Sequence, residues 1–207
     1  MHHWTISRRM RWFLRGALAF GFLLAEPTLA VAHTSEPPEM TAGTFWNHFL
    51  PHHITYIQDG HAGPVIYDFQ DPNCPYCHVL YEHEAPLIAA GKLTVRYVPV
   101  AFLTPQSPAE AAAWLQSPHP LHALKHFETI IGPALRSGRY QSLPKTTPTP
   151  ATQKILHQNL TIMSEAGFEG TPAILFRAKD GKIGRIPGAI SETDLKKLLP
   201  HLWQTKD

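Results

Sequence analysis

Apolar residues along the chain follow two patterns, short continuous runs and stripes at helical spacing. Runs rich in valine, isoleucine or aromatic residues and bounded by glycine or proline predict buried strands, and they lie at residues 64–69, 93–100 and 173–178. Apolar positions three or four residues apart predict helices at residues 41–58, with a break at Pro51, and at 74–90, 108–116, 120–131, 151–166 and 192–199. The turn sequence Asp180-Gly181 predicts a hairpin that leads into a strand at residues 183–186.

The order of these elements predicts an α/β fold with a mixed central sheet. The helix between the first two strands indicates a parallel pair, because a parallel connection needs a crossover, whereas the late two-residue turn indicates an antiparallel pair. Residues 104–166 contain three of the helices and are interpreted as a helical insertion, and the proline-rich residues 132–150 are predicted to form a surface loop. We therefore expect a single domain over residues 41–207.

The N-terminal segment has the layout of a secretory signal peptide. Four arginines precede an apolar run at residues 17–25, and the small-residue pattern Ala30-Val31-Ala32 follows. This run is shorter than the roughly 20 residues that span a bilayer, so we expect residues 1–32 to be cleaved near Ala32, with an uncleaved membrane anchor as the alternative. Residues 33–40 are then a flexible leader. Ser7-Arg8-Arg9 is a weak match to a twin-arginine signal and does not decide the export route.

Cleavage of this segment changes the charge of the chain. The whole sequence has a formal net charge of +2, but residues 1–32 contain four of its 18 basic and one of its 16 acidic residues, which leaves a net charge of −1. No basic stripe remains to neutralise phosphates. We therefore expect no nucleic-acid partner.

The two cysteines of the chain, Cys74 and Cys77, follow the first predicted strand of residues 64–69 and open the next predicted helix. A helix N-terminus favours a thiolate, so the pKa of Cys74 is expected well below the usual value of about 8.5, for example at about 4.5. We interpret Cys74 as the exposed, attacking sulfur and Cys77 as the resolving one. A single possible pair in an exported protein is too little for a disulfide framework, which favours a catalytic role.

Several motifs give the chain a family likeness. They are Phe69 with Asp71-Pro72, the Cys-Pro-Tyr-Cys motif at residues 74–77, the segment 102–115 and Gly170-Thr171-Pro172-Ala173. Over about residues 60–200 the chain resembles the thioredoxin superfamily and, within it, the periplasmic DsbC/DsbG thiol:disulfide interchange proteins. The resemblance implies a thioredoxin-like fold, a periplasmic location and protein thiol:disulfide oxidoreductase activity through a redox-active Cys74–Cys77 disulfide.

The resemblance also implies roles for residues around the cysteines. Pro172 would be a cis-proline lying against the pair, and Thr171 would offer its backbone to an extended substrate segment. Asp68 takes a place similar to that of the buried acid that exchanges a proton with the resolving cysteine. The alternative is that Asp68 points to solvent on an edge of its strand. Tyr76 lies inside the motif, and we expect it to be exposed and to bind substrate.

The partners that the resemblance implies are client proteins with cysteines and a membrane redox partner that recharges the pair. We expect no cofactor and no metal. Residues 33–60 are too few for the N-terminal dimerisation domain of the dimeric relatives, which predicts a monomer. Reduction of client disulfides or oxidised cysteines, in the manner of a reductase or isomerase, is our first interpretation. Oxidation of client thiols is the second.

Two other interpretations of the cysteines remain open. Cys74, Cys77 and His78 match the Cys-x-x-Cys-His motif that attaches a c-type haem, with His78 and either Met40 or Met163 as axial ligands. The two cysteines with His78 and His83 could instead bind zinc or copper.

Overall fold

The computed structural model of the chain describes residues 40–137 and 143–204, and the side chains of residues 133–137 are not part of that description. The predicted signal peptide and residues 33–39 of the predicted leader lie outside the described residues. Their assignment stays a prediction. Among the helices of the described segments, none combines the length and the apolar character that a membrane span requires.

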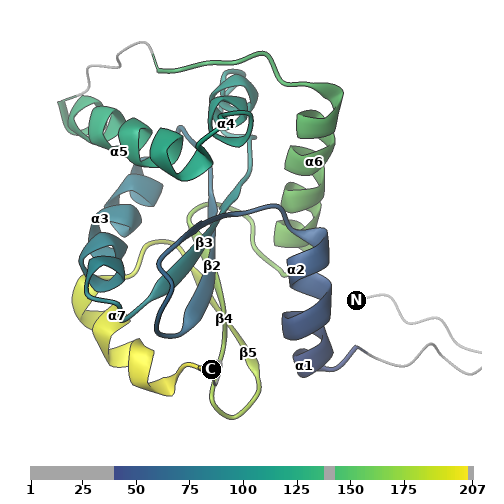
Figure 1. Cartoon of the computed structure of the whole chain (residues 1–207), viewed down its shortest axis with the longest axis vertical. Helices are drawn as coiled ribbons and strands as arrows, with labels where there is room; N and C mark the ends of the chain where they lie inside the picture. Colours follow the sequence, from purple (N-terminus) through teal and green to yellow (C-terminus); the bar gives the residue numbers. More distant parts are fainter. Residues whose placement is uncertain (1–39, 138–142, 205–207) are drawn as a thin grey trace, which may run out of the picture. The chain divides into compact units, whose positions relative to one another are not determined.

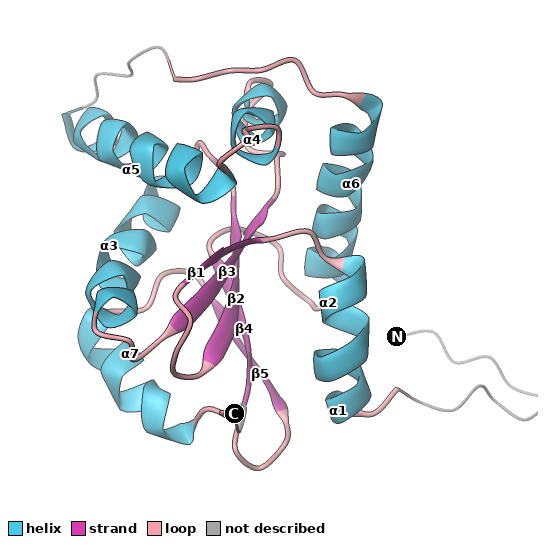
Figure 2. Cartoon of the chain, viewed as in Figure 1, coloured by secondary structure: helices cyan, strands magenta, loops and turns pink. Residues whose placement is uncertain are grey.

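A mixed sheet of five strands forms the centre of the fold (Figures 1 and 2). Its order is β1-β3-β2-β4-β5, and the strands are β1 (Ile57–Asp59), β2 (Val65–Gln70), β3 (Thr94–Pro99), β4 (Ala173–Arg177) and β5 (Ile183–Pro187). The β2–β3 pair is parallel and the other pairs are antiparallel, which confirms the predicted mixed sheet. β2 is the central strand, so residues on it are buried on both faces.

Helices cover both faces of the sheet (Figure 2). On one face lie α3 (Pro75–Ala89), α5 (Pro120–Ser137) and α7 (Glu192–Leu198), followed by a short 3-10 turn (Leu199–His201). The other face carries α1 (Ala42–Thr44), a π-helical turn (Phe45–Phe49), α2 (Leu50–His53) and α6 (Pro150–Glu165). α4 (Ser107–Leu115) lies beyond the carboxyl ends of β2 and β3 and contacts α5 and α6.

The alternation of side chains along β2 divides the apolar core in two. Ile66 packs in the cluster under α3 and α5, whereas Tyr67 and Phe69 pack in the cluster under α2 and α6. Asp68 has the same parity as Ile66 and therefore lies on the α3 side of the sheet. The carboxyl group of Asp68 is thus on the face of the sheet that α3 covers.

Two predicted boundaries are wrong. The helix predicted for residues 41–58 ends at His53, and residues 57–59 form the edge strand β1. Pro51 does not break the helix, because it lies in the first turn of α2, where a missing N–H is tolerated, and the π-helical turn precedes it. The loop predicted for residues 132–150 begins too early, because α5 continues to Ser137.

A close helix contact explains the extension of α5. A Cβ atom on Gly132 would lie 1.9 Å from Nε2 of His78 on α3, so only glycine lets the two helices approach this closely. His78 Nδ1 also lies 2.7 Å from a carboxylate oxygen of Glu128 on α5. Packing against α3 therefore stabilises the helix beyond the point where its local sequence favours a loop.

Candidate redox-active site

The two thiols lie at the junction of the central strand and α3. Cys74 is the N-cap residue of α3, with an extended backbone (φ −89°, ψ 111°), and Pro75 follows in the first turn. The Cys77 N–H donates a hydrogen bond to Cys74 Sγ over 3.3 Å. Both cysteines are present as free thiols. Cys74 Sγ thus occupies the position at which a helix N-terminus stabilises negative charge.

Asp71 fixes the loop that carries Cys74. Its Oδ1 accepts hydrogen bonds from the Asn73 N–H (2.9 Å) and the Ser107 hydroxyl (2.8 Å). Its Oδ2 accepts from the N–H groups of Phe102 (2.8 Å) and Leu103 (3.0 Å). The carboxylate, which is almost fully buried, therefore joins the β2–α3 loop to the β3–α4 loop.

Sequence reasoning did not assign this role to Asp71. The signals available to it were the turn dipeptide Asp71-Pro72 and Ser107-Pro108 at the start of a helix. Neither reveals that the two segments meet, because the hydrogen bonds join residues more than 30 positions apart.

The Thr171–Pro172 peptide bond is cis, and it brings the loop before β4 against the first thiol. The Cys74 thiol donates a hydrogen bond to the Thr171 carbonyl oxygen over 3.2 Å. The expectation that Cys74 is exposed is wrong, because only 4% of its surface is accessible, against 3% for Cys77. The Thr171 carbonyl oxygen lies against the thiol, a tertiary contact that the position of Cys74 at a helix start does not reveal.

The electrostatic environments of the two thiols differ more than their exposure does. A hydrogen bond from the Cys77 side chain lowers the pKa of Cys74 to about 7, and burial opposes this effect. Hydrogen bonding with Thr171 and with the N–H groups of Cys77 and Tyr76 lowers the pKa further. Burial raises the pKa of Cys77 well above its usual value, and negative charge on Cys74 and Asp68 adds to this. The lowered pKa of Cys74 has the expected direction, but it stays well above 4.5. Cys74 is thus the thiol that ionises first.

Asp68 is fully buried on β2 beneath the cysteines. Its Oδ2 accepts a hydrogen bond from Gln70 Nε2 over 2.5 Å, and its Oδ1 has no hydrogen-bond partner in the described part of the chain. Burial raises the pKa of Asp68 well above its usual value; the Gln70 hydrogen bond opposes this, and negative charge on Cys74 adds to it. The alternative in which Asp68 points to solvent is wrong, since β2 is the central strand.

Exposed apolar side chains gather next to the thiols. Within the described residues the large apolar side chains that are exposed are Met40, Tyr76, Val79, Phe102 and Leu103. Apart from Met40, all of them lie in the first turns of α3 or in the β3–α4 loop, the two segments that Asp71 joins. We call these four residues the apolar rim. Tyr76, with 67% of its surface accessible, is its most exposed member, as expected.

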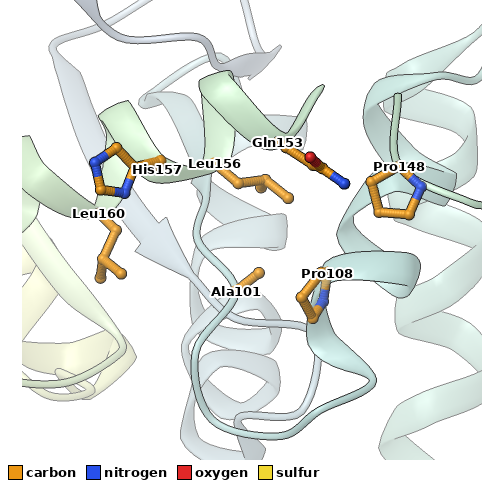
Figure 3. A pocket seen from close by; sticks show the side chains of 7 residues that line it. All are labelled: Ala101, Pro108, Pro148, Gln153, Leu156, His157 and Leu160. Atoms are coloured by element: carbon orange, nitrogen blue, oxygen red, sulfur yellow. The ribbon is translucent and has the colours of Figure 1, made fainter. Parts of the chain in front are cut away.

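A hollow of about 370 Å³ lies behind the β3–α4 loop, between α4 and α6. Figure 3 shows Leu156, Gln153 and Pro148 facing Ala101 and Pro108 across it. Ala101 immediately precedes the rim residue Phe102. The hollow thus adjoins the apolar rim in sequence and is itself lined mostly by apolar side chains.

The geometry does not favour the two other interpretations of the cysteines. His78 is buried between α3 and α5 and contacts Glu128, whereas Met163 lies in the core on the opposite face of the sheet, so these two side chains do not face a common haem site. Met40 is exposed, just before α1. Among the described residues, no group of three or more His, Cys, Asp or Glu side chains is arranged to hold a metal ion.

The fold and the paired thiols define a thioredoxin-like protein with a Cys-x-x-Cys site at the start of its first long helix. Such a site can carry out thiol–disulfide exchange. The model of the thioredoxin-like domain family matches residues 51–203, and the chain belongs to this family.

Two curated relatives are similar to the chain. It is 33% identical over 147 residues to the thiol:disulfide interchange protein DsbG of Pseudomonas aeruginosa, a match that covers 70% of this chain and 55% of the relative. It is 28% identical over 138 residues to DsbG of Escherichia coli K12, which covers 67% of this chain and 53% of the relative. The chain thus spans about half the length of these relatives.

Solved structures share the fold at lower identity. The catalytic domain of Proteus mirabilis ScsC superposes with a TM-score of 0.56 at 20% identity, over 77% of this chain and 97% of that domain. A periplasmic thioredoxin-like protein from Salmonella enterica serovar Typhimurium gives a TM-score of 0.53 at 20% identity, over 70% and 88% of the two chains. These matches support the thioredoxin-like fold.

Proposed function

We propose that the protein is a thiol:disulfide oxidoreductase that acts on cysteine-containing client proteins through Cys74 and Cys77. The proposal rests on the environment of the Cys74 thiol. The thiol caps α3, accepts a hydrogen bond from the Cys77 N–H, and lies against the carbonyl oxygen of Thr171, next to the cis-proline Pro172. The similarity to two thiol:disulfide interchange proteins supports the same activity.

The reaction proceeds by two exchanges. The Cys74 thiolate attacks one sulfur of a client disulfide, a Cys74–client disulfide forms, and the second client sulfur leaves as a thiolate that is protonated by solvent. Cys77 then gives its proton to Asp68 and attacks Cys74 Sγ, which releases the first client sulfur as a thiolate. The client has gained two electrons, and the Cys74–Cys77 disulfide has formed.

A pKa of about 7 for Cys74 suits the first exchange at neutral pH. Such a thiol is about half ionised at pH 7, against about 3% for a free thiol with a pKa near 8.5. The thiolate fraction is thus about 16-fold higher, while intrinsic nucleophilicity is about fivefold lower for a Brønsted slope near 0.45. The net gain in attack rate is about threefold. The pKa is close to the value at which attack is fastest.

The same pKa bears on the direction of electron flow. A very low pKa stabilises the reduced pair and makes its disulfide strongly oxidising, as in pairs with a pKa of about 3.5, whereas pairs with a pKa of about 7 are found in strongly reducing proteins. The value of about 7 for Cys74 therefore favours the reduction of client disulfides or sulfenic acids, in the manner of a reductase or isomerase. Oxidation of client thiols is the second candidate.

The apolar rim provides a surface for client segments. Tyr76 and Val79 come from the start of α3, which Cys74 caps, and Phe102 and Leu103 come from the loop that Asp71 ties to it. None of the four side chains is charged. Unfolded or extended clients expose apolar side chains that fit such a surface. The backbone of Thr171, at the cis-proline, is proposed to hold the client main chain.

We further propose that the protein is exported to the periplasm and is recharged there by a membrane redox partner. The arginine-rich and apolar pattern of residues 1–32 supports export. The oligomeric state stays a prediction.

The redox state of the cysteine pair in intact cells tests the direction. Rapid acid quenching followed by alkylation separates dithiol from disulfide, and mainly dithiol is expected for a reductase or isomerase. Mainly disulfide would favour the oxidase. If Cys74→Ser left exchange with a peptide disulfide unchanged in the purified protein, the proposed activity itself would be wrong.

A further inference from the structure

A second acid lies fully buried below the active site. Glu84 occupies the inward stripe of α3, at the spacing i, i+3, i+7 and i+10 that also places Cys77, Leu80 and Leu87 against the sheet. Leu80 and Leu87 belong to the apolar core, but Glu84 puts a carboxyl group between them. Neither carboxyl oxygen has a hydrogen-bond partner in the described part of the chain.

The sheet presents two more polar groups to this carboxyl. Asp68 on β2 and Tyr97 on β3 are direct neighbours in the parallel register, so their side chains leave the sheet on the same face, toward α3. Both residues are fully buried. Asp68 Oδ1 and the Tyr97 hydroxyl are also without hydrogen-bond partners among the described residues. Buried polar groups of this kind are usually bridged by internal water.

This polar chain leads to the surface on the side away from the thiols. The ring of Tyr97 lies 6.0 Å from that of Tyr81, one helical turn before Glu84. Tyr81 lines an open hollow of about 440 Å³ together with Asp59 and Lys125. Lys125 Nζ lies 2.8 and 2.9 Å from the two carboxylate oxygens of Asp59, which makes this ion pair the polar end of the route.

We propose that Asp68, Tyr97 and Glu84 form a buried proton-transfer chain that connects Cys77 with solvent at the Asp59–Lys125 pair. The inference rests on the proposed exchange function. In the Cys74–client disulfide the client covers the mouth of the active site. A proton held on Asp68 must then leave through the other end of the proton-transfer chain, at the Asp59–Lys125 pair, before Asp68 can accept the Cys77 proton. Glu84 is a positioning residue in this scheme, because it acts through Asp68 and touches neither thiol.

The charges around Glu84 link its protonation to that of Asp68. Burial raises the pKa of Glu84 well above its usual value, and the negative charges of Asp68 on β2, Glu128 on α5 and Asp59 on β1 raise it further. The Tyr97 hydroxyl lies close enough to lower the pKa, although the pair lacks hydrogen-bond geometry. From α7 the core receives the apolar Leu195. Ionised Asp68 thus makes ionisation of Glu84 more costly, which couples the protonation of the two carboxyl groups.

The test isolates the step that uses Cys77. A disulfide is prepared between Cys74 and a thiol peptide, and release of the peptide is followed by stopped flow in the wild type, Glu84→Gln and Tyr97→Phe. Release is followed as a function of pH. On the acid side of the pH at which Asp68 titrates in the wild type, Glu84→Gln should slow release by about tenfold. On its alkaline side the difference should shrink to less than about twofold, because Asp68 is then ionised before release begins. Tyr97→Phe should follow the same pattern.

Two controls separate a relay from a change in structure. Glu165→Gln alters an exposed acid on α6 and should match the wild type over the whole pH range. Attack of Cys74 on a small aromatic disulfide does not need Cys77, so it should be unchanged in Glu84→Gln. A slowing that is equal over the whole pH range, a slowed attack by Cys74, or unaltered release on the acid side of the Asp68 titration would each overturn the relay. Wild-type protein that released no peptide at all would instead contradict the proposed function.

Discussion

Cys74 Sγ lies 3.2 Å from the carbonyl oxygen of Thr171, a residue 97 positions later in the chain. The contact joins the N-terminus of α3 to the loop that enters β4, and only 4% of the surface of Cys74 is accessible. The thiol and the cis-proline loop therefore lie side by side, which is the arrangement that the proposed binding of a client main chain at Thr171 requires.

The first prediction concerns the ionisation of Cys74. Thiolate absorbance at 240 nm should titrate with a midpoint at about pH 7, because the hydrogen bond from Cys77 outweighs burial. Cys74→Ser serves as the blank and should remove this transition. Cys77→Ser should retain it with a higher midpoint, since the hydroxyl is a different donor. A midpoint near that of a free thiol would contradict the assignment of Cys74 as the attacking sulfur.

The same pKa predicts a pH dependence of stability for the reduced protein. The pKa of Cys74 is lower in the folded than in the unfolded chain, so the unfolded chain binds more protons between pH 7 and about pH 8.5. The free energy of unfolding of the wild type, relative to that of Cys74→Ser, should therefore increase as the pH rises through this range. This added stability should be lost as the pH falls back to 7 and below. Urea titrations of the reduced proteins at pH 6 and pH 9 measure the difference.

A further prediction concerns Asp71, whose carboxylate accepts four hydrogen bonds from Asn73, Ser107, Phe102 and Leu103. Asp71→Asn turns an amide N–H toward backbone donors, and it should lower the free energy of unfolding by about 2 to 4 kcal/mol. Exchange activity should fall as well, because the loop before Cys74 is released. Asp180→Asn, at an exposed turn, should leave both quantities nearly unchanged. Equal effects of the two variants would show that Asp71 does not fix the loop.

Asp68 gives a prediction of opposite sign. Its pKa is raised by burial in the folded chain, so its contribution to stability is greatest at low pH and is lost as the pH rises above the unfolded value of about 4. Asp68→Asn should therefore stabilise the protein more at pH 8 than at pH 4, while it slows the release of client by Cys77. A stability difference that does not depend on pH would mean that the pKa of Asp68 is the same in the folded and the unfolded chain.

The cysteine pair was found from its own spacing, because Cys74 and Cys77 are one helical turn apart at the start of α3. The cis bond at Thr171–Pro172 was expected only from the resemblance to the thioredoxin superfamily, and the bond is indeed cis. The short edge strand β1 was missed, because three residues after a helix carry too little periodicity to be recognised. The burial of Cys74 was also missed, because it depends on a tertiary contact.

Glu84 was missed for a different reason. Glu84 lies in the apolar stripe of α3, at a position where a core residue is expected. The sequence pattern therefore shows only that an acidic side chain points inward, and not what that side chain does. Its meaning depends on Asp68 and Tyr97, which the sheet register brings to the same face. The sequence places each of these residues on its own element, but only the fold places them together.

The last prediction concerns the apolar rim. Phe102 and Leu103 are exposed next to Cys74, and a client that covers either one removes apolar surface from water. Phe102→Ser or Leu103→Ser should raise KM for a denatured, disulfide-bonded client by about fivefold, which corresponds to about 1 kcal/mol of lost apolar burial. The rate with a small aromatic disulfide and the pKa of Cys74 should not change, because neither depends on the rim. Met40→Ser removes an even more exposed apolar side chain from outside the rim and should leave KM unaltered. Loss of rate with the small disulfide would indicate a distorted loop, and an equal effect of Met40→Ser would indicate that clients bind without regard to the rim.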